Sequence, residues 1–417
     1  MNTWWTIVFG LVAWTGTATL RGETCAPVRL EQPAGVLTVE ECGLSLAPSA
    51  ADCPSSGATG DAWWAVVMEP APGCAGGDII LESHRQAAPA VTRSRGGVTL
   101  VYRTLGVGQS RYDVAVTLTF RAEDGVFEIG GELRNRTKEW LVKGFTGPVV
   151  NGIRTTLAET PLLMPSGFGW RINGVPDDPK SPKPWARNGE RLVVEARYPS
   201  ANCTMQWFAF AGEKGGLYFG SHDLRHGAKT LSARYDPASR RFGAAFQHEF
   251  FVRPGERREI PPTVVMPYMG SWHAAARAYR AWADTAGSPL KRPEWTRTAS
   301  GWLLAILKQQ NGDIMWPYGK LAALSEVADR HGLDILGLFG WGYGGHDHLY
   351  PDYNPCPLMG GETALREGIK AARARGKRVV LYANGQLLER GTAYWTETGR
   401  HLAVTCRDGG TVQEFWH

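Results

Sequence analysis

The sequence predicts a chain with two architectures, an antiparallel β domain followed by an α/β region with parallel strands. Three observations predict it. Residues 26–268 consist of short strand patterns separated by turns, an Ala-rich helix pattern follows at 271–287, and strand and helix patterns alternate from residue 299 onward. The chain has 417 residues, 43% hydrophobic and 20% charged, which is typical of a folded protein of two or three domains.

The first 22 residues are expected to form a signal peptide or an N-terminal anchor. An apolar run from Trp4 to Trp14 is too short to span a bilayer comfortably, and small residues at Gly16–Ala18 offer a cleavage site. No basic residue precedes the run, which departs from the usual signal pattern. The sequence therefore predicts a secreted, periplasmic or extracellular protein with no membrane contact beyond this segment.

The cysteine and charge content narrows the classes of partner. Cys25, Cys42, Cys53 and Cys74 lie close together in the sequence and are able to form two disulfides, which fits export. No CxxC pair occurs, which disfavours a structural zinc site, and no cofactor is expected. The net charge of +5 is scattered without a basic run, which disfavours nucleic acid as a partner.

Strand patterns fill residues 26–268. In Tyr112–Phe120, apolar residues alternate with Ala and Thr, as in a strand with one buried face. Turn signals separate several such segments, and no long helical period interrupts them. The sequence predicts an antiparallel β-sandwich, with a Pro-rich insertion at 173–190 as an exposed loop.

A helix and connector are predicted at 271–297. Ser271 is placed as the cap, and Trp272, Ala275, Tyr279 and Trp282 fall on one helical stripe, so this helix is expected to pack against a large surface.

Three apolar strand patterns then alternate with two helix patterns. The strands are 301–307, 333–341 and 377–387, and the first is apolar enough to be covered on both faces. The helix patterns at 318–332 and 361–376 each end on glycine. Parallel strands with right-handed crossovers follow, in either a βα-barrel or an open doubly wound sheet.

The length of this region limits the barrel interpretation. A complete (β/α)8 barrel requires about 200–250 residues, whereas 119 residues remain from Ala299 onward. If the region 298–417 belongs to such a TIM barrel, it is expected to be the N-terminal part of a truncated catalytic domain.

The loop after the second of these strands contains Gly340, Gly342 and Gly345 at GxGxxG spacing. A dinucleotide site requires a helix to begin inside the motif, yet the next helix pattern begins only near Glu362. Bulky Trp341 also stands where phosphate would approach the backbone. The spacing therefore does not indicate a nucleotide site.

Two other interpretations of the loop remain. His346 and His348 form an HxH resembling that of metal-dependent amidohydrolase barrels, although most of the further ligands are missing from the sequence. Alternatively, rings and polar groups at the mouth of a barrel bind a sugar, which needs flat apolar faces and charge-assisted hydrogen bonds. The candidate substrate-binding residues are Trp341, Tyr343, His346, Asp347, His348, Asp352 and Asn384.

Three segments resemble one group of enzymes. Tyr198–Asp223 resembles the late strands of the galactose-mutarotase-like β-supersandwich, Ser271–Ala283 resembles the helix that joins it to a barrel, and Gly340–Leu387 resembles the second and third βα units. The set is similar to endo-α-N-acetylgalactosaminidase-like proteins and to a poorly characterised family of secreted glycoside hydrolases, a domain of unknown function, akin to the α-galactosidase clan. It covers about Arg29–Trp416.

The resemblance implies a retaining α-glycosidase that acts on an oligo- or polysaccharide with two carboxyl groups about 5 Å apart. In the α-galactosidase clan the nucleophile ends strand four and the acid/base follows later, so no catalytic residue is assigned and both are expected beyond His417. The chain by itself is then an inactive fragment. Asp347 corresponds to an acidic residue that binds sugar hydroxyls, and Asn384 lies at the strand-three edge of the pocket.

Two alternatives stay open at this point. In the first alternative the chain is a non-catalytic carbohydrate-binding protein. In the second it is a metal-dependent barrel hydrolase that uses His346 and His348.

Overall fold

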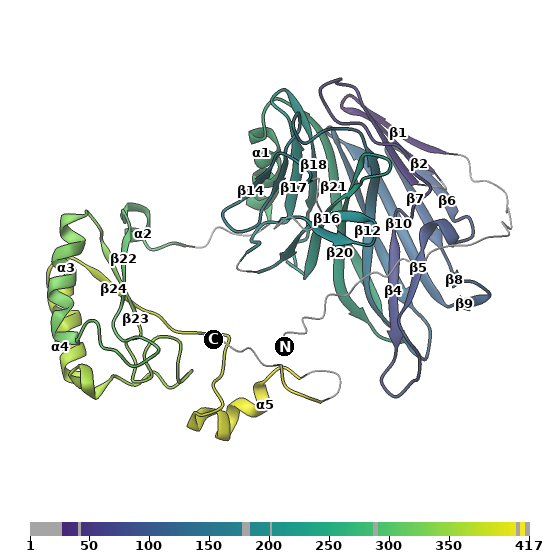
Figure 1. Cartoon of the computed structure of the whole chain (residues 1–417). Helices are drawn as coiled ribbons and strands as arrows, with labels where there is room; N and C mark the ends of the chain where they lie inside the picture. The colour runs from purple at the N-terminus through teal and green to yellow at the C-terminus, as the bar shows by residue number, and fades with distance from the viewer. Residues whose placement is uncertain are drawn as a thin grey trace. The chain divides into compact units, whose positions relative to one another are not determined.

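The computed structural model describes residues 27–40, 43–176, 184–200, 202–286, 291–405 and 409–412. The chain divides into two compact units, Met1–Pro289 and Leu290–His417, both drawn in Figure 1. The expected signal segment 1–22 lies outside the described residues. In the described ranges, no helix is both long and apolar enough to cross a membrane.

Two large sheets form most of the first unit, and their strands pair antiparallel, as predicted. The nine-stranded sheet has the order β14 (Trp170–Ile172), β13 (Leu162–Met164), β17 (Trp207–Ala211), β18 (Gly215–Ser221), β21 (Arg257–Met269), β11 (Val126–Asn135), β10 (Val114–Glu123), β7 (Gly97–Tyr102) and β6 (Ala90–Ser94). The seven-stranded sheet has the order β15 (Ala186–Asn188), β16 (Arg191–Tyr198), β19 (Lys229–Asp236), β20 (Arg241–Val252), β12 (Trp140–Ile153), β4 (Ala65–Pro70) and β5 (Ile79–Glu82).

Smaller elements complete this unit. They are the three-stranded sheet β1 (Val28–Gln32), β2 (Gly35–Glu40) and β3 (Gly43–Pro48), the pair β8 (Leu105–Val107) and β9 (Ser110–Tyr112), and helix α1 (His273–Thr285). Residues 177–183 of the predicted Pro-rich loop lie outside the described residues.

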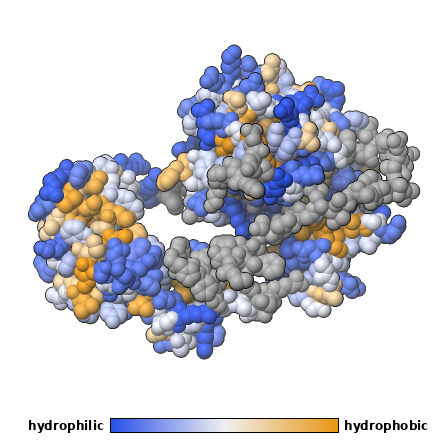
Figure 2. Space-filling view, in the orientation of Figure 1, coloured by the Kyte–Doolittle hydropathy of each residue, from blue (hydrophilic) through white to orange (hydrophobic). Residues whose placement is uncertain are grey.

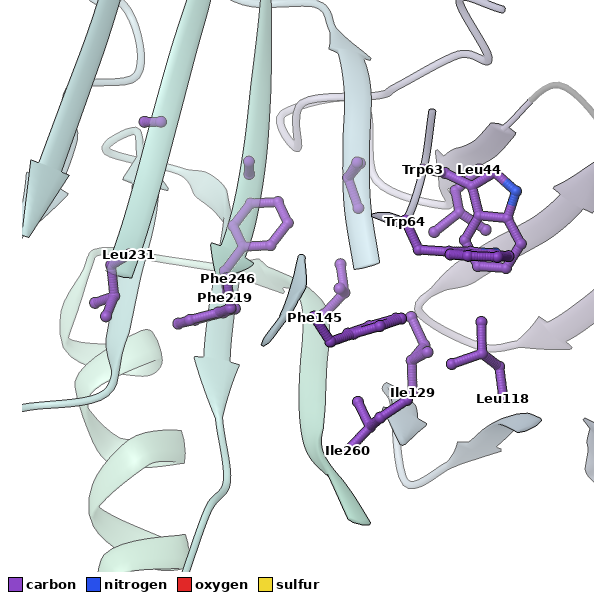
Figure 3. Close-up of a cluster of buried hydrophobic side chains, with 14 of the residues drawn as sticks. Leu44, Trp63, Trp64, Leu118, Ile129, Phe145, Phe219, Leu231, Phe246 and Ile260 are labelled. Carbon is purple, nitrogen blue, oxygen red and sulfur yellow. The ribbon is translucent and has the colours of Figure 1, made fainter. Parts of the chain in front are cut away.

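The alternating pattern of β10 places its apolar side chains in the core. Val116, Leu118 and Phe120 are buried, whereas Thr117 and Thr119 on the opposite face are partly exposed. Figure 3 shows Leu118 near Ile129, Trp64 and Phe145, side chains that belong to one large buried cluster. Burial of this apolar surface is the main stabilising term of the unit.

Two tryptophans are the largest of the fully buried side chains in this core. Trp63 and Trp64 are fully buried, and the Trp64 ring packs edge-on to Tyr102 with 4.9 Å between centroids. High tryptophan content is compatible with sugar-stacking surfaces, but these two residues fill the interior and are not accessible to a ligand.

Helix α1 packs on β18 and β21, as the apolar stripe predicted. Ala275 is completely buried, and the Trp282 ring stacks on His222 with 4.7 Å between centroids. Two details of the prediction are wrong. Trp272 precedes the helix as its N-cap and is 45% exposed, and the Ser271 hydroxyl bonds the His273 ring at 3.1 Å instead of a backbone N–H of the first turn.

The structure also corrects the expected pair of disulfides. Cys53 is a buried free thiol that donates to the Tyr268 carbonyl at 3.1 Å, and Cys74 is an exposed free thiol. Cys25 and Cys42 lie outside the described residues. Two disulfides among these four cysteines would need both Cys53 and Cys74 to be paired.

The second unit contains a three-stranded parallel sheet covered on one face by helices, and Figure 1 shows α3 and α4 side by side along it. Leu336 and Leu338 pack toward α3 and α4 in a small buried core. The elements are α2 (Trp295–Thr298), β22 (Trp302–Ile306), α3 (Leu321–Arg330), β23 (Ile335–Phe339), α4 (Gly361–Ala374), β24 (Arg378–Leu381) and α5 (Arg400–Leu402).

The other face of this sheet is open in the described part of the chain, although β22 was predicted to be covered on both faces. Trp302 is 54% exposed, Leu304 is 47% exposed, and Val380 lies in the same row as Leu304. Gly337 stands between them, with Trp302 close enough that an added Cβ would meet its ring at 3.2 Å. Figure 2 shows hydrophobic side chains at the surface of both units among hydrophilic ones.

A buried polar cluster lies in the first unit. Lys229 is fully buried, and its ammonium group pairs with Asp223 at 2.9 Å and donates to Gln206 at 2.5 Å. His248 is buried nearby, and neither of its ring nitrogens has a hydrogen-bond partner among the described residues. Burial, reinforced by the positive charge of Lys229, lowers the pKa of His248 to about 3.

This histidine predicts a dependence of stability on pH. Below about pH 6.5 the unfolded chain protonates His248, whereas the folded chain does not do so until about pH 3. The unfolded state therefore binds more protons in this window, and the free energy of unfolding falls by about 1.4 kcal/mol per pH unit as pH decreases. Urea unfolding at pH 4–7, followed by tryptophan fluorescence, measures this slope.

The variant His248→Leu is expected to reduce that slope by about one proton, or about 1.4 kcal/mol per pH unit. The exposed His84 provides the control, since His84→Leu makes the same substitution outside the core. Equal slopes in His248→Leu and the unmodified protein would show that His248 titrates normally in the folded state.

Candidate functional site

The candidate site lies where β22, β23 and β24 end. Because the strands are parallel, their carboxyl ends share one edge of the sheet, and the loops that follow them meet there. The loop after β23 is the longest of these, and it begins at Gly340 with φ 59°. A Cβ at Gly340 would come within 2.2 Å of the Lys308 carbonyl, so only glycine fits this close approach to the loop after β22.

The glycine spacing has no helix associated with it. Helix α4 begins at Gly361, well beyond Gly345, and residues 346–356 between them contain turns and irregular segments but no helix. The glycines instead allow close backbone contact, since the Gly345 position also lies against the Gln309 carbonyl.

Three tyrosines connect four of the predicted site residues. This tyrosine cluster consists of Tyr350, Tyr353 and Tyr382. The hydroxyl of Tyr350 donates to Asp347, and the Tyr353 hydroxyl accepts from the backbone N–H of Asn384. Trp341 stacks on Tyr353 and donates its indole N–H to the Tyr382 carbonyl at 2.8 Å, while the His346 ring lies near that of Tyr382. The structure thus gathers Trp341, His346, Asp347 and Asn384.

Asp347 is the carboxylate of this group. It has φ 60°, a conformation that Asp and Asn tolerate better than most residues. One oxygen accepts from Tyr350 and the other lies 3.2 Å from the His346 ring, and the side chain remains 28% exposed. Asp347 is therefore held in place with part of its surface accessible to a ligand.

The Tyr350 hydroxyl serves as a donor and the Tyr353 hydroxyl as an acceptor. Burial, followed by the hydrogen bond to the negative Asp347, raises the pKa of Tyr350 well above its usual value. Burial likewise raises the pKa of Tyr353. Both hydroxyls stay protonated through the physiological pH range, so the network keeps its hydrogen-bond directions.

The remaining predicted residues lie outside this group. His348 is exposed and faces Glu389, with 3.8 Å between the ring nitrogen and the carboxylate. Tyr343 is also exposed, and Asp352 forms part of the turn at Pro351, where its backbone N–H donates to the Leu349 carbonyl.

The two histidines have different carboxylate partners, which bears on the metal-dependent alternative. His346 contacts Asp347, whereas His348 contacts Glu389. Across the residues that the structure describes, His, Cys, Asp and Glu side chains do not form a group of three or more suited to a metal ion. The two histidines therefore do not belong to one metal site among the described residues.

Lys308 is a site residue that sequence reasoning missed. It lies two residues after the end of β22, is only 8% exposed, and donates to the Tyr343 carbonyl at 2.6 Å. Its own carbonyl accepts from the His346 N–H at 2.9 Å. A lysine immediately after the apolar run at 301–307 was the available signal, because carboxyl ends of barrel strands hold functional groups.

Tyr318 fixes the base of the loop and was also missed. Its buried hydroxyl donates to the Trp341 carbonyl at 2.5 Å and accepts from the Cys356 N–H at 2.7 Å. One side chain thereby joins the two ends of the segment 341–356. No sequence pattern distinguishes Tyr318 from an ordinary core residue, because its partners are backbone groups of a distant loop.

Comparison with known proteins gives one family match. A family model described as a domain of unknown function, DUF6259, matches residues 261–417, the part that contains all three parallel strands. A protein of Bacteroides thetaiotaomicron named "Putative glycoside hydrolase" is 24% identical over 238 residues, which cover 55% of this chain and 34% of that protein.

Solved structures share the fold. The α-N-acetylgalactosaminidase NagBb from Bifidobacterium bifidum in complex with GalNAc has a TM-score of 0.67 at 14% identity, covering 92% of this chain and 62% of that one. Its complex with Gal-NHAc-DNJ has the same TM-score at 15% identity and the same coverage. The chain spans about a third of the curated relative and less than two thirds of this enzyme. This chain therefore has a glycoside-hydrolase-like fold.

The bridge made by Tyr318 predicts a local effect of its removal. Tyr318→Phe leaves the buried Cys356 N–H without a partner, which costs about 1–3 kcal/mol. Amides of residues 341–356 should then exchange faster with deuterium than in the unmodified protein, as measured by mass spectrometry. Tyr343→Phe, the same substitution at an exposed tyrosine, is the matched control. Unchanged exchange in Tyr318→Phe would show that other contacts hold the loop.

Proposed function

We propose that the chain is the sandwich and first barrel part of a glycoside hydrolase, a retaining α-glycosidase that acts on an oligo- or polysaccharide. The observation that carries the proposal is the gathering of Asp347, His346 and Asn384 with aromatic rings at the carboxyl edge of three parallel strands. The fold likeness to an α-N-acetylgalactosaminidase supports this choice of reaction class.

The open face of the small sheet supports a barrel. Trp302, Leu304 and Val380 expose apolar surface on the side of the sheet away from α3 and α4. In a βα-barrel this side faces the interior, where side chains of the other strands cover it. We therefore place the three strands at the start of a (β/α)8 barrel whose further strands bury this face.

Within that barrel, the described residues would bind the sugar and leave the bond cleavage to others. Asp347 accepts hydrogen bonds from sugar hydroxyls, and the histidine and tyrosine groups around it donate and accept. A retaining mechanism needs a carboxylate nucleophile and a carboxyl acid/base about 5–5.5 Å apart. We assign neither role to residues 1–417 and propose that later strands supply both.

The apolar N-terminal segment supports export of this enzyme. We propose that residues 1–22 direct secretion to the periplasm or the exterior, where polysaccharide substrates occur.

Replacement of Asp347 tests the proposed function. In the full-length protein, Asp347→Asn removes the charge, and asparagine tolerates the positive φ of this position, so the loop keeps its shape. Loss of charge-assisted hydrogen bonds worth about 1.5–3 kcal/mol predicts a fall in kcat/KM of about 10–150-fold. Aryl α-N-acetylgalactosaminide and aryl α-galactoside are the substrates to measure.

Glu362→Gln is the control for that measurement. Glu362 is an exposed carboxylate of α4 paired with Arg366, and its loss should leave kcat/KM unchanged. Both variants should melt within a few degrees of the unmodified protein, because exposed substitutions change stability little. Equal kcat/KM in Asp347→Asn and the unmodified protein would remove Asp347 from the binding site.

A further inference from the structure

The first unit contains a large surface cleft built from residues other than those of the proposed glycosidase site. Its volume is about 1100 Å³, enough for an oligosaccharide segment. The walls come from four segments, 51–54, 154–171, 205–215 and 271–272, which include the β13–β14 hairpin and the N-terminal end of α1.

Aromatic side chains stand exposed around this cleft. Phe168 lies at the tip of the β13–β14 hairpin between two glycines in the left-handed region, Gly167 with φ 60° and Gly169 with φ 96°, and its ring is fully exposed. The turn is fixed by backbone bonds, since the Gly167 N–H donates to the Asn202 carbonyl at 2.7 Å. Trp272 is also exposed on the wall, and Trp170 is half-buried there.

The clustering of these aromatic side chains around one cleft points to a ligand. A single exposed aromatic residue is ordinary on a protein surface, but an apolar group collected around one concave site marks a binding surface. Flat rings of Phe and Trp pack against the apolar face of a sugar ring, and they lose little conformational entropy when they do so.

The charged residues of the walls balance each other. Asp52, Glu159 and Glu213 face a lining that also contains Arg154, Arg171 and Lys214. An anionic polysaccharide would favour an excess of positive charge, which this lining lacks. Carboxylate and guanidinium groups together suit hydroxyls, because a hydroxyl both donates and accepts hydrogen bonds.

We propose that this cleft binds a neutral saccharide chain, as a second carbohydrate site that would keep a polymeric substrate bound to the enzyme. The choice of a saccharide as ligand rests on the proposed function, whereas the choice of a neutral one rests on the balanced lining. Phe168 and Trp272 are the stacking residues, and the charged groups position the hydroxyls.

Affinity electrophoresis of the full-length protein tests the proposal. The gels contain galactomannan or desialylated mucin as neutral probes, and alginate as the anionic probe. At least one neutral probe should retard the protein. Phe168→Ala and Trp272→Ala should each raise the Kd for that probe about ten-fold. Phe251→Ala is the matched control, because Phe251 is an exposed aromatic residue of the same unit outside the cleft.

The outcomes separate this proposal from the glycosidase. Asp347→Asn should leave retardation unchanged, and Phe168→Ala should leave the hydrolysis of small aryl glycosides unchanged. If the protein shows no turnover but its retardation still depends on the cleft, only the proposed glycosidase activity is contradicted. Three results would overturn the neutral saccharide site. They are retardation by alginate alone, no retardation by any probe, and equal retardation of Phe168→Ala and Phe251→Ala. Protection of Phe168 from hydroxyl-radical labelling without glycan would do the same, by showing that another part of the protein covers the cleft.

Discussion

A β-sheet with an apolar face must bury that face, and this constraint organises both units of the chain. In the first unit two antiparallel sheets cover each other, with Trp64 and Phe145 between them. In the second unit the helices α3 and α4 cover one face of three parallel strands. The parallel order of these strands then brings the loops that follow them to one edge, where the candidate site lies.

Much of this arrangement was predictable because it follows from periodicity. The alternation in β10, the apolar runs of β22 and β23, and the glycines after α3 and α4 each indicate one type of element. The parallel pairing also followed from strand–helix alternation. The prediction that β22 is covered on both faces was wrong for the described residues. An apolar run shows the composition of a strand but not which other elements pack against it.

The candidate site was predictable in its location but not in its contacts. The sequence places His346 and His348 two residues apart, yet they pair with different carboxylates, because the backbone turns sharply around His348. Lys308 and Tyr318 contribute through bonds with backbone carbonyls and amides of a distant loop. Such contacts depend on loop conformation, which no period encodes. Tryptophan content was equally ambiguous, since Trp64 is core whereas Trp272 is exposed.

The left-handed residues of the loop after β23 bear on how a ligand would be received. Leu349 has φ 59°, which an aliphatic residue adopts only at a cost of about 1–2 kcal/mol. Its N–H is bound by Glu389, and the neighbouring Tyr350 is buried. Surrounding contacts therefore hold the loop in a conformation that it would not adopt alone. A loop that is preorganised in this way loses little further entropy when a ligand arrives, so more of the contact energy remains as affinity.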